Sequence, residues 1–334
     1  MTVRVGINGM GRIGRALVRR CEQDEALEVV AVNDVADPHQ VARLLTRDST
    51  FGRFGGDIQC EGDLLMVDGR KIAISTEREP RLLPWAKHDV EVVVDATGRF
   101  RTRGELAPHL DAGARSVVLS APGKDVDATI VMGVNDETYD PARHRVVSNA
   151  SCTTNCVAPM VKVLDDAFGL EHGFMTTVHA YTGDQNLLDA PHRDARRARA
   201  AAVNIVPTTT GAARAVGAVL PALAGRLDGV ALRVPVLDGS LVDLAAVLAR
   251  EVTTTSVNAA FAEAAASGSL AGRLRCESEP MVSADVIGDP ASCVFDPELT
   301  QAAGRLVKVF GWHDNEWGYT CRLADLVLLM GARP

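Results

Sequence analysis

Short apolar runs alternate with amphipathic helical segments through the first 150 residues of the chain. The helical segments include 13–21, 38–46 and 104–112. A parallel sheet built from strand–helix–strand units gives this alternation. We therefore predict an α/β domain over residues 1–150. The apolar runs that we expect to form its strands are 3–7, 27–32, 90–95, 116–120, 129–133 and 146–148.

The hydrophobic pattern changes after residue 152. Longer apolar runs predict strands at 174–178, 230–236 and 241–250, and the residues 257–265 predict a helix. This mixture is typical of an α+β domain on a mostly antiparallel sheet, which we assign to residues 151–315. The segment 317–330 predicts a final helix that packs back on the first domain, so that residues 316–334 complete it. A length of 334 residues also favours two domains.

Composition narrows the class of protein. The apolar fraction of 47% indicates a soluble globular chain, and without a run of about 18 apolar residues we expect no membrane span. The chain enters a strand at once, with no signal-peptide pattern, so we expect it in the cytoplasm. A net charge of −8 works against nucleic-acid binding. Seven cysteines without a C-x-x-C pair favour reduced thiols, and imply neither a disulfide framework nor a metal.

A glycine motif lies between the first predicted strand and the first predicted helix. Gly9, Gly11 and Gly14 have the G-x-G-x-x-G spacing of dinucleotide-binding turns. The second strand ends at Asp34, where a carboxylate hydrogen-bonds ribose hydroxyls and repels a 2′-phosphate. We therefore predict NAD rather than NADP. A glycine turn without cofactor is the alternative, and Arg12 either neutralises phosphate or is simply solvated.

A cysteine lies between a strand expected at 144–149 and a helix expected at 153–166. Cys152 is in the segment Ser148-Asn-Ala-Ser-Cys-Thr-Thr-Asn155. The helix dipole and unpaired backbone N–H groups at such a position favour the nucleophilic thiolate. The alternative is a small buried hydrophobe. The polar setting and the cofactor motif favour the nucleophile.

With these features in place, the whole chain resembles the phosphorylating glyceraldehyde-3-phosphate dehydrogenases of the bacterial glycolytic, NAD-preferring type. The resemblance implies a Rossmann NAD-binding domain, followed by a catalytic domain. The motifs that carry it are at 6–15, 148–159, 176–182, 193–199, 207–213 and 312–319.

The resemblance implies a covalent mechanism. Cys152 adds to the aldehyde to give a hemithioacetal, with His179 as the general base. Hydride transfer to nicotinamide gives a thioester, from which inorganic phosphate releases 1,3-bisphosphoglycerate. The resemblance also assigns the C3 phosphate of glyceraldehyde 3-phosphate to Thr182 and Arg233. The resemblance assigns the attacking phosphate to a second set of residues, whose guanidinium, hydroxyl and backbone groups suit its oxygens. These residues are Ser151, Thr153, Arg197, Thr210 and Gly211.

Further residues match positions that line the NAD site of the family. Asn315 resembles the residue that binds the nicotinamide carboxamide, and Tyr319 the aromatic residue beside it. The other matches are Arg12, Ile13, Asp34, Arg78, Thr97 and Ser120. Val35 and Pro191 are of the NAD-preferring kind, although 181–185 and 204–207 resemble NADP-using plastid-type enzymes. NAD remains the prediction.

Departures from the family pattern leave alternatives open. Residues 236–240 read Val-Leu-Asp-Gly-Ser where Thr-Pro-Asn-Val-Ser is commoner, and Ala284 replaces a usual serine. Sequence drift in an active enzyme is the simplest explanation of these changes. The alternative is that the chain is a second isozyme that tolerates a covalent inhibitor. Erythrose-4-phosphate dehydrogenase, which hydrolyses its thioester, is the runner-up enzyme. A thiol redox sensor using Cys152 and Cys156 is the non-enzyme alternative. The loop 182–205 resembles an inter-subunit loop of the family, which implies a homotetramer.

Overall fold

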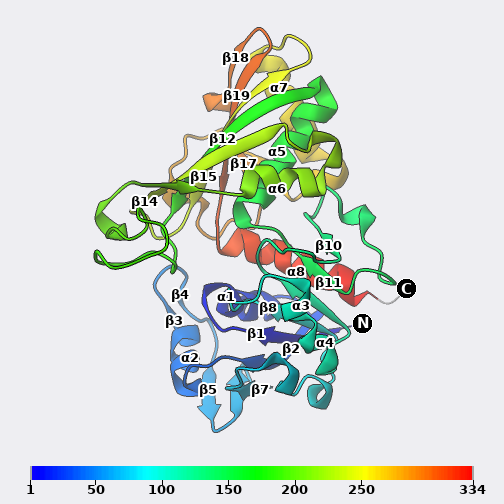
Figure 1. Cartoon of the computed structure of the whole chain (residues 1–334), viewed down its shortest axis with the longest axis vertical. Helices are drawn as coiled ribbons and strands as arrows, with labels where there is room; N and C mark the ends of the chain where they lie inside the picture. The colour runs from blue at the N-terminus through cyan, green and yellow to red at the C-terminus, as the bar shows by residue number, and fades with distance from the viewer. Residues whose placement is uncertain (1, 333–334) are drawn as a thin grey trace. The chain divides into compact units, whose positions relative to one another are not determined.

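The computed structural model describes residues 2–332. Met1, Arg333 and Pro334, which the expected domain bounds include, lie outside the described residues. The described residues divide into two compact units, one made of 2–130, 137–150 and 320–332, the other of 131–136 and 151–319. Figure 1 shows the elements of both units.

The first unit is built on a mostly parallel sheet. Its central strand β1 (Val3–Asn8) pairs in parallel with β2 (Leu27–Asn33) on one side and β8 (Val92–Asp95) on the other. Within the described residues the strand order is β10-β11-β9-β8-β1-β2-β7-β6-β5, and pairing is antiparallel only between β5, β6 and β7. The outer strands are β5 (Ile58–Glu61), β6 (Leu64–Val67), β7 (Arg70–Ser75), β9 (Ser116–Leu119), β10 (Ala128–Thr129) and β11 (Val146–Ser148).

Strand β8 is buried along its whole length and β1 everywhere except at Arg4, which is why both appear in the sequence as mainly apolar runs. Helix α1 (Arg12–Cys21) follows β1. Helix α2 (Pro38–Thr46) begins at the residue that we predicted, because Asp37 caps it and proline fits the first turn. A short antiparallel pair, β3 (Arg47–Asp48) and β4 (Gly52–Arg53), comes next in the chain.

Two local predictions in this unit were wrong. The strand expected at 129–133 ends at Thr129, since Gly133 has a positive φ of 83° and the chain turns there. The helix expected at 104–112 is two short helices, α3 (Arg103–Leu106) and α4 (Pro108–Asp111). Pro108 lacks the N–H that would continue the first helix.

The second unit has a mostly antiparallel sheet, as predicted. Strand β12 (Leu170–Ala180) pairs antiparallel with β15 (Ser240–Leu248), which pairs antiparallel with β19 (Leu306–His313). Strand β12 also pairs in parallel with β14 (Leu227–Val234). The remaining strands are β13 (Val206–Thr209), β16 (Leu274–Cys276), β17 (Cys293–Phe295) and β18 (Gln301–Ala303).

One face of this second sheet is buried. Val242, Leu244 and Ala246 of β15 are buried while the residues between them are partly exposed. Helix α5 (Cys152–Phe168) packs against β15 and β19. The other helices are α6 (Ala212–Val219), α7 (Thr254–Ala266) and α8 (Trp317–Gly331), of which α8 lies largely in the first unit. None of the helices described within residues 2–332 is long and apolar enough to span a membrane.

Candidate functional site

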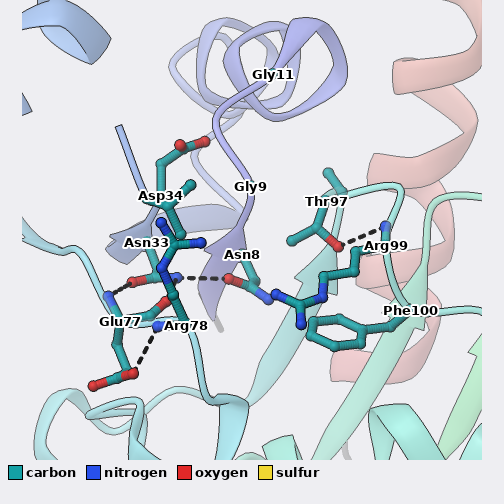
Figure 2. A pocket seen from close by; sticks show the side chains of 12 residues that line it. Asn8, Gly9, Gly11, Asn33, Asp34, Glu77, Arg78, Thr97, Arg99 and Phe100 are labelled. Carbon is teal, nitrogen blue, oxygen red and sulfur yellow. Dashed lines mark hydrogen bonds between the residues drawn. The ribbon is translucent and has the colours of Figure 1, made fainter. Parts of the chain in front are cut away.

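A cavity of about 370 Å³ opens at the carboxyl ends of β1, β2 and β8 in the first unit. The chain runs outward from β1 to β2 on one side and returns to β8 on the other, so the cavity lies at the switch point where α/β sheets bind ligands. Figure 2 shows Asp34 and Arg78 on one side of Gly9, with Thr97 and Phe100 on the other. The lining residues are Asn8, Gly9, Gly11, Asn33, Asp34, Val35, Glu77, Arg78, Ala96, Thr97, Arg99 and Phe100.

The three motif glycines differ in what a side chain at each position would contact. Gly9 has a φ of +98°, and a Cβ on it would lie 2.7 Å from the backbone of Ala96 and Thr97. A Cβ on Gly14 would lie 2.0 Å from the carbonyl oxygen of Gly9. A Cβ on Gly11 would meet no described atom within 4 Å. Gly11 is therefore dispensable for packing, and it leaves the α1 N-terminus open to an anion such as a pyrophosphate.

Backbone groups hold the Asp34 carboxylate at the edge of the cavity. Its Oδ2 accepts a hydrogen bond from Met10 N at 2.7 Å, and its Oδ1 accepts one from Ala36 N at 2.9 Å. Asn33 Nδ2 donates to Asn8 Oδ1 at 2.8 Å in the floor beside it. These residues fit a dinucleotide, because a fixed carboxylate and an open helix N-terminus suit ribose and pyrophosphate.

The structure places some of the predicted NAD residues at the cavity and others outside its described lining. Gly9, Gly11, Asp34, Arg78 and Thr97 line it. In the first unit, the predicted residues outside the lining are Arg12, Ile13, Gly14 and Ser120. Arg12 pairs with Asp48, Ile13 and Gly14 lie in α1, and the N–H of Ser120 donates to Asp95 O at 3.0 Å.

Sequence reasoning missed Asn8, Asn33, Glu77, Arg99 and Phe100 as lining residues. A signal was present for Asn8 and Asn33, which directly follow the predicted strands 3–7 and 27–32, whereas Glu77 follows β7, a strand that was not predicted. Carboxyl ends of neighbouring parallel strands meet at one edge of the sheet.

In the second unit, Cys152 faces His179. Cys152 is the first residue of α5, whose N-cap Ser151 accepts from Thr154 N at 3.0 Å. His179 lies near the end of β12, with its Nε2 at 3.4 Å from Cys152 Sγ. Its Nδ1 is 2.7 Å from the Ala180 carbonyl oxygen, which can only accept. The proton therefore resides on Nδ1, and an unprotonated Nε2 faces the thiol.

Burial keeps this pair neutral at rest. It lowers the pKa of His179 to about 4, and Arg233 acts in the same direction. It also raises the pKa of Cys152, although the charge of Arg233 and hydrogen bonds from Thr153 oppose the rise. Burial therefore acts on the thiol pKa in the opposite direction to the helix terminus from which the sequence analysis argued.

Polar groups that suit phosphate lie in one connected cluster. Arg233 Nη1 donates to Thr182 Oγ1 at 2.7 Å. Asp184 accepts from both Thr182 and Arg197, so it joins the two arginines. Arg197 Nε donates to Thr208 Oγ1 at 2.9 Å. Asp184 was missed, although an acid two residues after Thr182 was visible in the sequence.

Two helix N-termini lie side by side in the same unit. Thr154 Oγ1, in the first turn of α5, donates to the carbonyl of Ala212, the first residue of α6, at 3.4 Å. The predicted phosphate residues Ser151 and Thr153 are at the start of α5, and Thr210 and Gly211 are at the start of α6. Arg197 Nη2 approaches this second helix start through a 3.4 Å contact with Thr209 O. Both helix ends favour an anion.

Asn315 and Tyr319 also belong to the second unit. Asn315 Oδ1 accepts from Ser240 Oγ at 2.6 Å, and Tyr319 is buried in α8. His313 lies beside His179 with ring centroids 6.0 Å apart. Ser240 and His313 were missed, since nothing in a strand sequence shows which neighbours it will meet.

Comparison with known proteins decides the family. Residues 3–103 match the model of the glyceraldehyde 3-phosphate dehydrogenase NAD binding domain, and residues 151–315 match that of the C-terminal domain. The chain belongs to the glyceraldehyde-3-phosphate dehydrogenase family.

Curated relatives are similar over the full chain. Glyceraldehyde-3-phosphate dehydrogenase of Kitasatospora aureofaciens is 56% identical over 331 residues, and that of Streptomyces coelicolor is 54% identical over 333 residues. The Mycobacterium avium protein of the same name is 54% identical over 338 residues. In each comparison 99% of both chains is covered.

Family membership confirms the predicted family, the fold class and the cofactor NAD. The chain is an oxidoreductase of a glycolytic family. The pocket in the first unit fits the NAD-binding domain that the family model assigns there.

Proposed function

We propose that the enzyme oxidises D-glyceraldehyde 3-phosphate to 1,3-bisphosphoglycerate, with NAD and inorganic phosphate as co-substrates. The observation that carries the proposal is the Cys152 thiol facing an unprotonated His179 Nε2 at 3.4 Å. A nucleophile beside a correctly oriented base is the arrangement that covalent aldehyde chemistry needs. The names of the curated relatives support the substrate.

The first step is addition of sulfur to the aldehyde carbon. The proton passes from Cys152 Sγ to His179 Nε2 as the C–S bond forms, and it then neutralises the developing oxyanion to give a hemithioacetal. Isolated charges would be costly in this buried setting, but a Cys152 thiolate formed during the transfer has the His179 imidazolium nitrogen only 3.4 Å away. Their attraction compensates for part of the desolvation.

Oxidation and product release use the same pair. His179 takes the hydroxyl proton of the hemithioacetal, while bound NAD supplies the acceptor for the hydride, which leaves a thioester on Cys152. Phosphate oxygen then attacks the thioester carbon, the C–S bond breaks, and the thiolate is released. His179, protonated in the preceding step, lies beside this leaving thiolate and returns its proton.

The two phosphates are assigned to the polar groups described above. We propose that Arg233 and Thr182, already joined by a 2.7 Å hydrogen bond, bind the C3 phosphate. The adjoining starts of α5 and α6 suit inorganic phosphate. The residues proposed there are Ser151, Thr153, Arg197, Thr210 and Gly211.

We also propose the NAD contacts. Asp34 binds the adenosine ribose, and the backbone at Gly11 binds the pyrophosphate. Because Ser240 occupies the Asn315 Oδ1, the donor end of that amide is the end available to a nicotinamide carboxamide. Tyr319 lies four residues further on, in α8.

The test is NADH formation from glyceraldehyde 3-phosphate, with and without inorganic phosphate, repeated with NADP and with erythrose 4-phosphate. We expect turnover that requires phosphate and prefers NAD. Cys152→Ser should abolish it, and His179→Gln should lower kcat by about 10²- to 10⁴-fold. Cys60→Ser, which changes a partly exposed thiol in β5, is the matched control. Phosphate-independent turnover with erythrose 4-phosphate preferred would overturn the proposal.

We propose that the enzyme is a homotetramer. Large apolar side chains are exposed on the loop 181–205, where Leu187 is 76% and Leu188 is 78% exposed, and Phe174 in β12 is 74% exposed. Leu187 and Leu188 are adjacent in the chain, and contiguous exposed apolar groups mark interfaces. Light scattering should give four times the chain mass of 35.5 kDa. A monomeric mass would contradict the proposal, and Leu188→Asp should shift the wild-type mass downward.

A further inference from the structure

We infer that Cys152, His179 and His313 form an inhibitory site for a soft divalent cation, with Zn²⁺ as the probe. The inference concerns a ligand that the dehydrogenase reaction does not use. Its readout is binding, so it stands or falls separately from the proposed function.

The ligand atoms of the three residues already converge. Cys152 Sγ and one ring nitrogen of each histidine lie within 4.8 Å of one another. In tetrahedral Zn²⁺ sites, S and N ligands are separated by about 3.5–3.6 Å, because Zn–S is about 2.3 Å and Zn–N about 2.0–2.1 Å. The Cys152–His179 pair stands at 3.4 Å. Movements of about an ångström therefore close the site around one ion.

The sheet explains why the two histidines meet. His179 lies near the end of β12, and β15 begins beside it, with Val178 opposite Leu241. Strand β19 pairs with the other side of β15 and places His313 opposite Ser240. Both histidines thus lie at one end of three adjacent strands, with ring centroids 6.0 Å apart and the planes inclined at 69°.

His313 supplies the observation that points to a ligand. Its side chain is 2% exposed, and neither ring nitrogen has a hydrogen-bond partner among the described residues. Buried polar atoms are nearly always paired, so this imidazole retains unused donor and acceptor capacity. Burial lowers its pKa to about 3, so the ring is neutral, which is the form that binds metals.

The donor set selects the class of cation. One thiolate and two imidazoles suit Zn²⁺, whereas Mg²⁺ and Ca²⁺ prefer oxygen ligands. Binding replaces the proton on Cys152 Sγ with the metal, and the proton goes to solvent. Cys152 is half-buried, so an ion can reach it. The bound sulfur can no longer attack an aldehyde, and a fourth position remains for water.

The experiment measures Zn²⁺ binding to the full-length protein by competition with a chromogenic chelator. We expect one ion per chain in the wild type and loss of that ion in Cys152→Ser. His313→Phe should weaken binding by about 100-fold or more, since even indirect partners of a ligand contribute 10- to 100-fold. Exposed His39 gives the matched control His39→Phe, which should bind as wild type does. His313→Gln provides a second variant if the phenylalanine protein does not fold.

Co²⁺ gives a spectroscopic check in the same proteins. Binding to sulfur should produce a thiolate-to-cobalt charge-transfer band, absent in Cys152→Ser and weakened in His313→Phe at equal Co²⁺. Dehydrogenase activity should be lost on Zn²⁺ addition and return with EDTA, and Mg²⁺ should have no effect. The inference is overturned if the wild type binds no Zn²⁺, or if His313→Phe binds it with unchanged affinity.

Discussion

The hydroxyl of Ser240 donates a 2.6 Å hydrogen bond to Oδ1 of Asn315. The same hydroxyl accepts from the backbone N–H of Ala180 at 3.2 Å, and the carbonyl of Ala180 receives the His179 Nδ1 proton at 2.7 Å. One buried serine therefore joins the residue proposed to hold nicotinamide to the base that faces Cys152. Ser240 is a positioning residue, because it acts through its neighbours.

Replacing Ser240 with alanine should break the hydrogen-bonded connection between Asn315 and His179. The change leaves Asn315 Oδ1 and Ala180 N without their partner, and each buried unpaired group costs about 1–3 kcal/mol. We expect kcat/KM for NAD to fall by about 10- to 100-fold, with KM for inorganic phosphate nearly unchanged. Steady-state kinetics check this, with Ser267→Ala as a control, because the Ser267 hydroxyl donates to Glu263 O on the surface. If kcat/KM for NAD and KM for inorganic phosphate changed by the same factor, the substitution would have disrupted the whole site rather than the contacts of Ser240.

The motif glycines should separate folding from cofactor binding. Gly14→Ala places a Cβ 2.0 Å from Gly9 O, so we expect strong loss of thermal stability. Gly11→Ala meets no described atom within 4 Å, so its Tm without NAD should match that of the wild type. NAD must approach the backbone there, so Gly11→Ala should raise the Kd for NAD at least about tenfold. Unchanged NAD affinity in Gly11→Ala would contradict this assignment of roles.

Local patterns in the sequence predicted the parts of the fold that local rules control. The start of α2 was predicted correctly at Pro38, and the cofactor turn followed from Gly9 and Asp34. The antiparallel β5 and β6 were missed, because short half-exposed strands give little periodicity.

Contacts distant in the sequence could not be predicted in the same way. Cys152 and His179 are 27 residues apart and belong to a helix and a strand whose packing no spacing rule fixes. Only the family resemblance paired them in advance. The direction of the Cys152 pKa also depends on burial, which the sequence did not show, whereas its place at the start of α5 was predictable.

The two arginines of the polar cluster should control different substrates. Arg233 contacts Thr182, whereas Arg197 contacts Thr208 and approaches Thr209 beside the start of α6. Lysine keeps the charge but loses the planar fork that matches phosphate. We expect Arg197→Lys to raise KM for inorganic phosphate more than KM for glyceraldehyde 3-phosphate. Arg233→Lys should do the reverse.

The comparison is made by varying each substrate with the other saturating. Arg214→Lys, which alters an exposed arginine paired with Asp228, serves as the control. If both cluster variants shift the same KM, the separate assignment of the two phosphates is wrong.

Asp238 should make stability depend on pH. Its side chain is buried, its Oδ1 accepts from Gly239 N at 2.8 Å, and the carboxyl of Asp314 lies within hydrogen-bonding reach. Burial, followed by the charges of Asp314 and Glu316, raises the pKa of Asp238 to about 9. A protonated Asp238 can donate its Oδ2 hydrogen to Asp314, which an ionised one cannot.

The sign follows from proton counting. In the unfolded chain Asp238 titrates near its ordinary pKa of about 3.9, so between about pH 4 and pH 9 the folded state holds a proton that the unfolded state has lost. The free energy of unfolding should therefore fall as pH rises through this window, by up to about 1.4 kcal/mol per unit for one proton. Asp238→Asn should remove that slope, because an amide donates to Asp314 without titrating.

Urea unfolding at several pH values within that window measures the difference. We expect the stability of Asp238→Asn relative to wild type to increase steadily toward alkaline pH. Asp166→Asn, at an exposed carboxylate paired with Lys162, is the control and should give only a small difference, because exposed ion pairs contribute little to stability. A constant gap between Asp238→Asn and wild type would show that the folded protein does not retain the Asp238 proton. The Asp238–Asp314 contact would then involve two carboxylates and would destabilise the turn that carries Asn315.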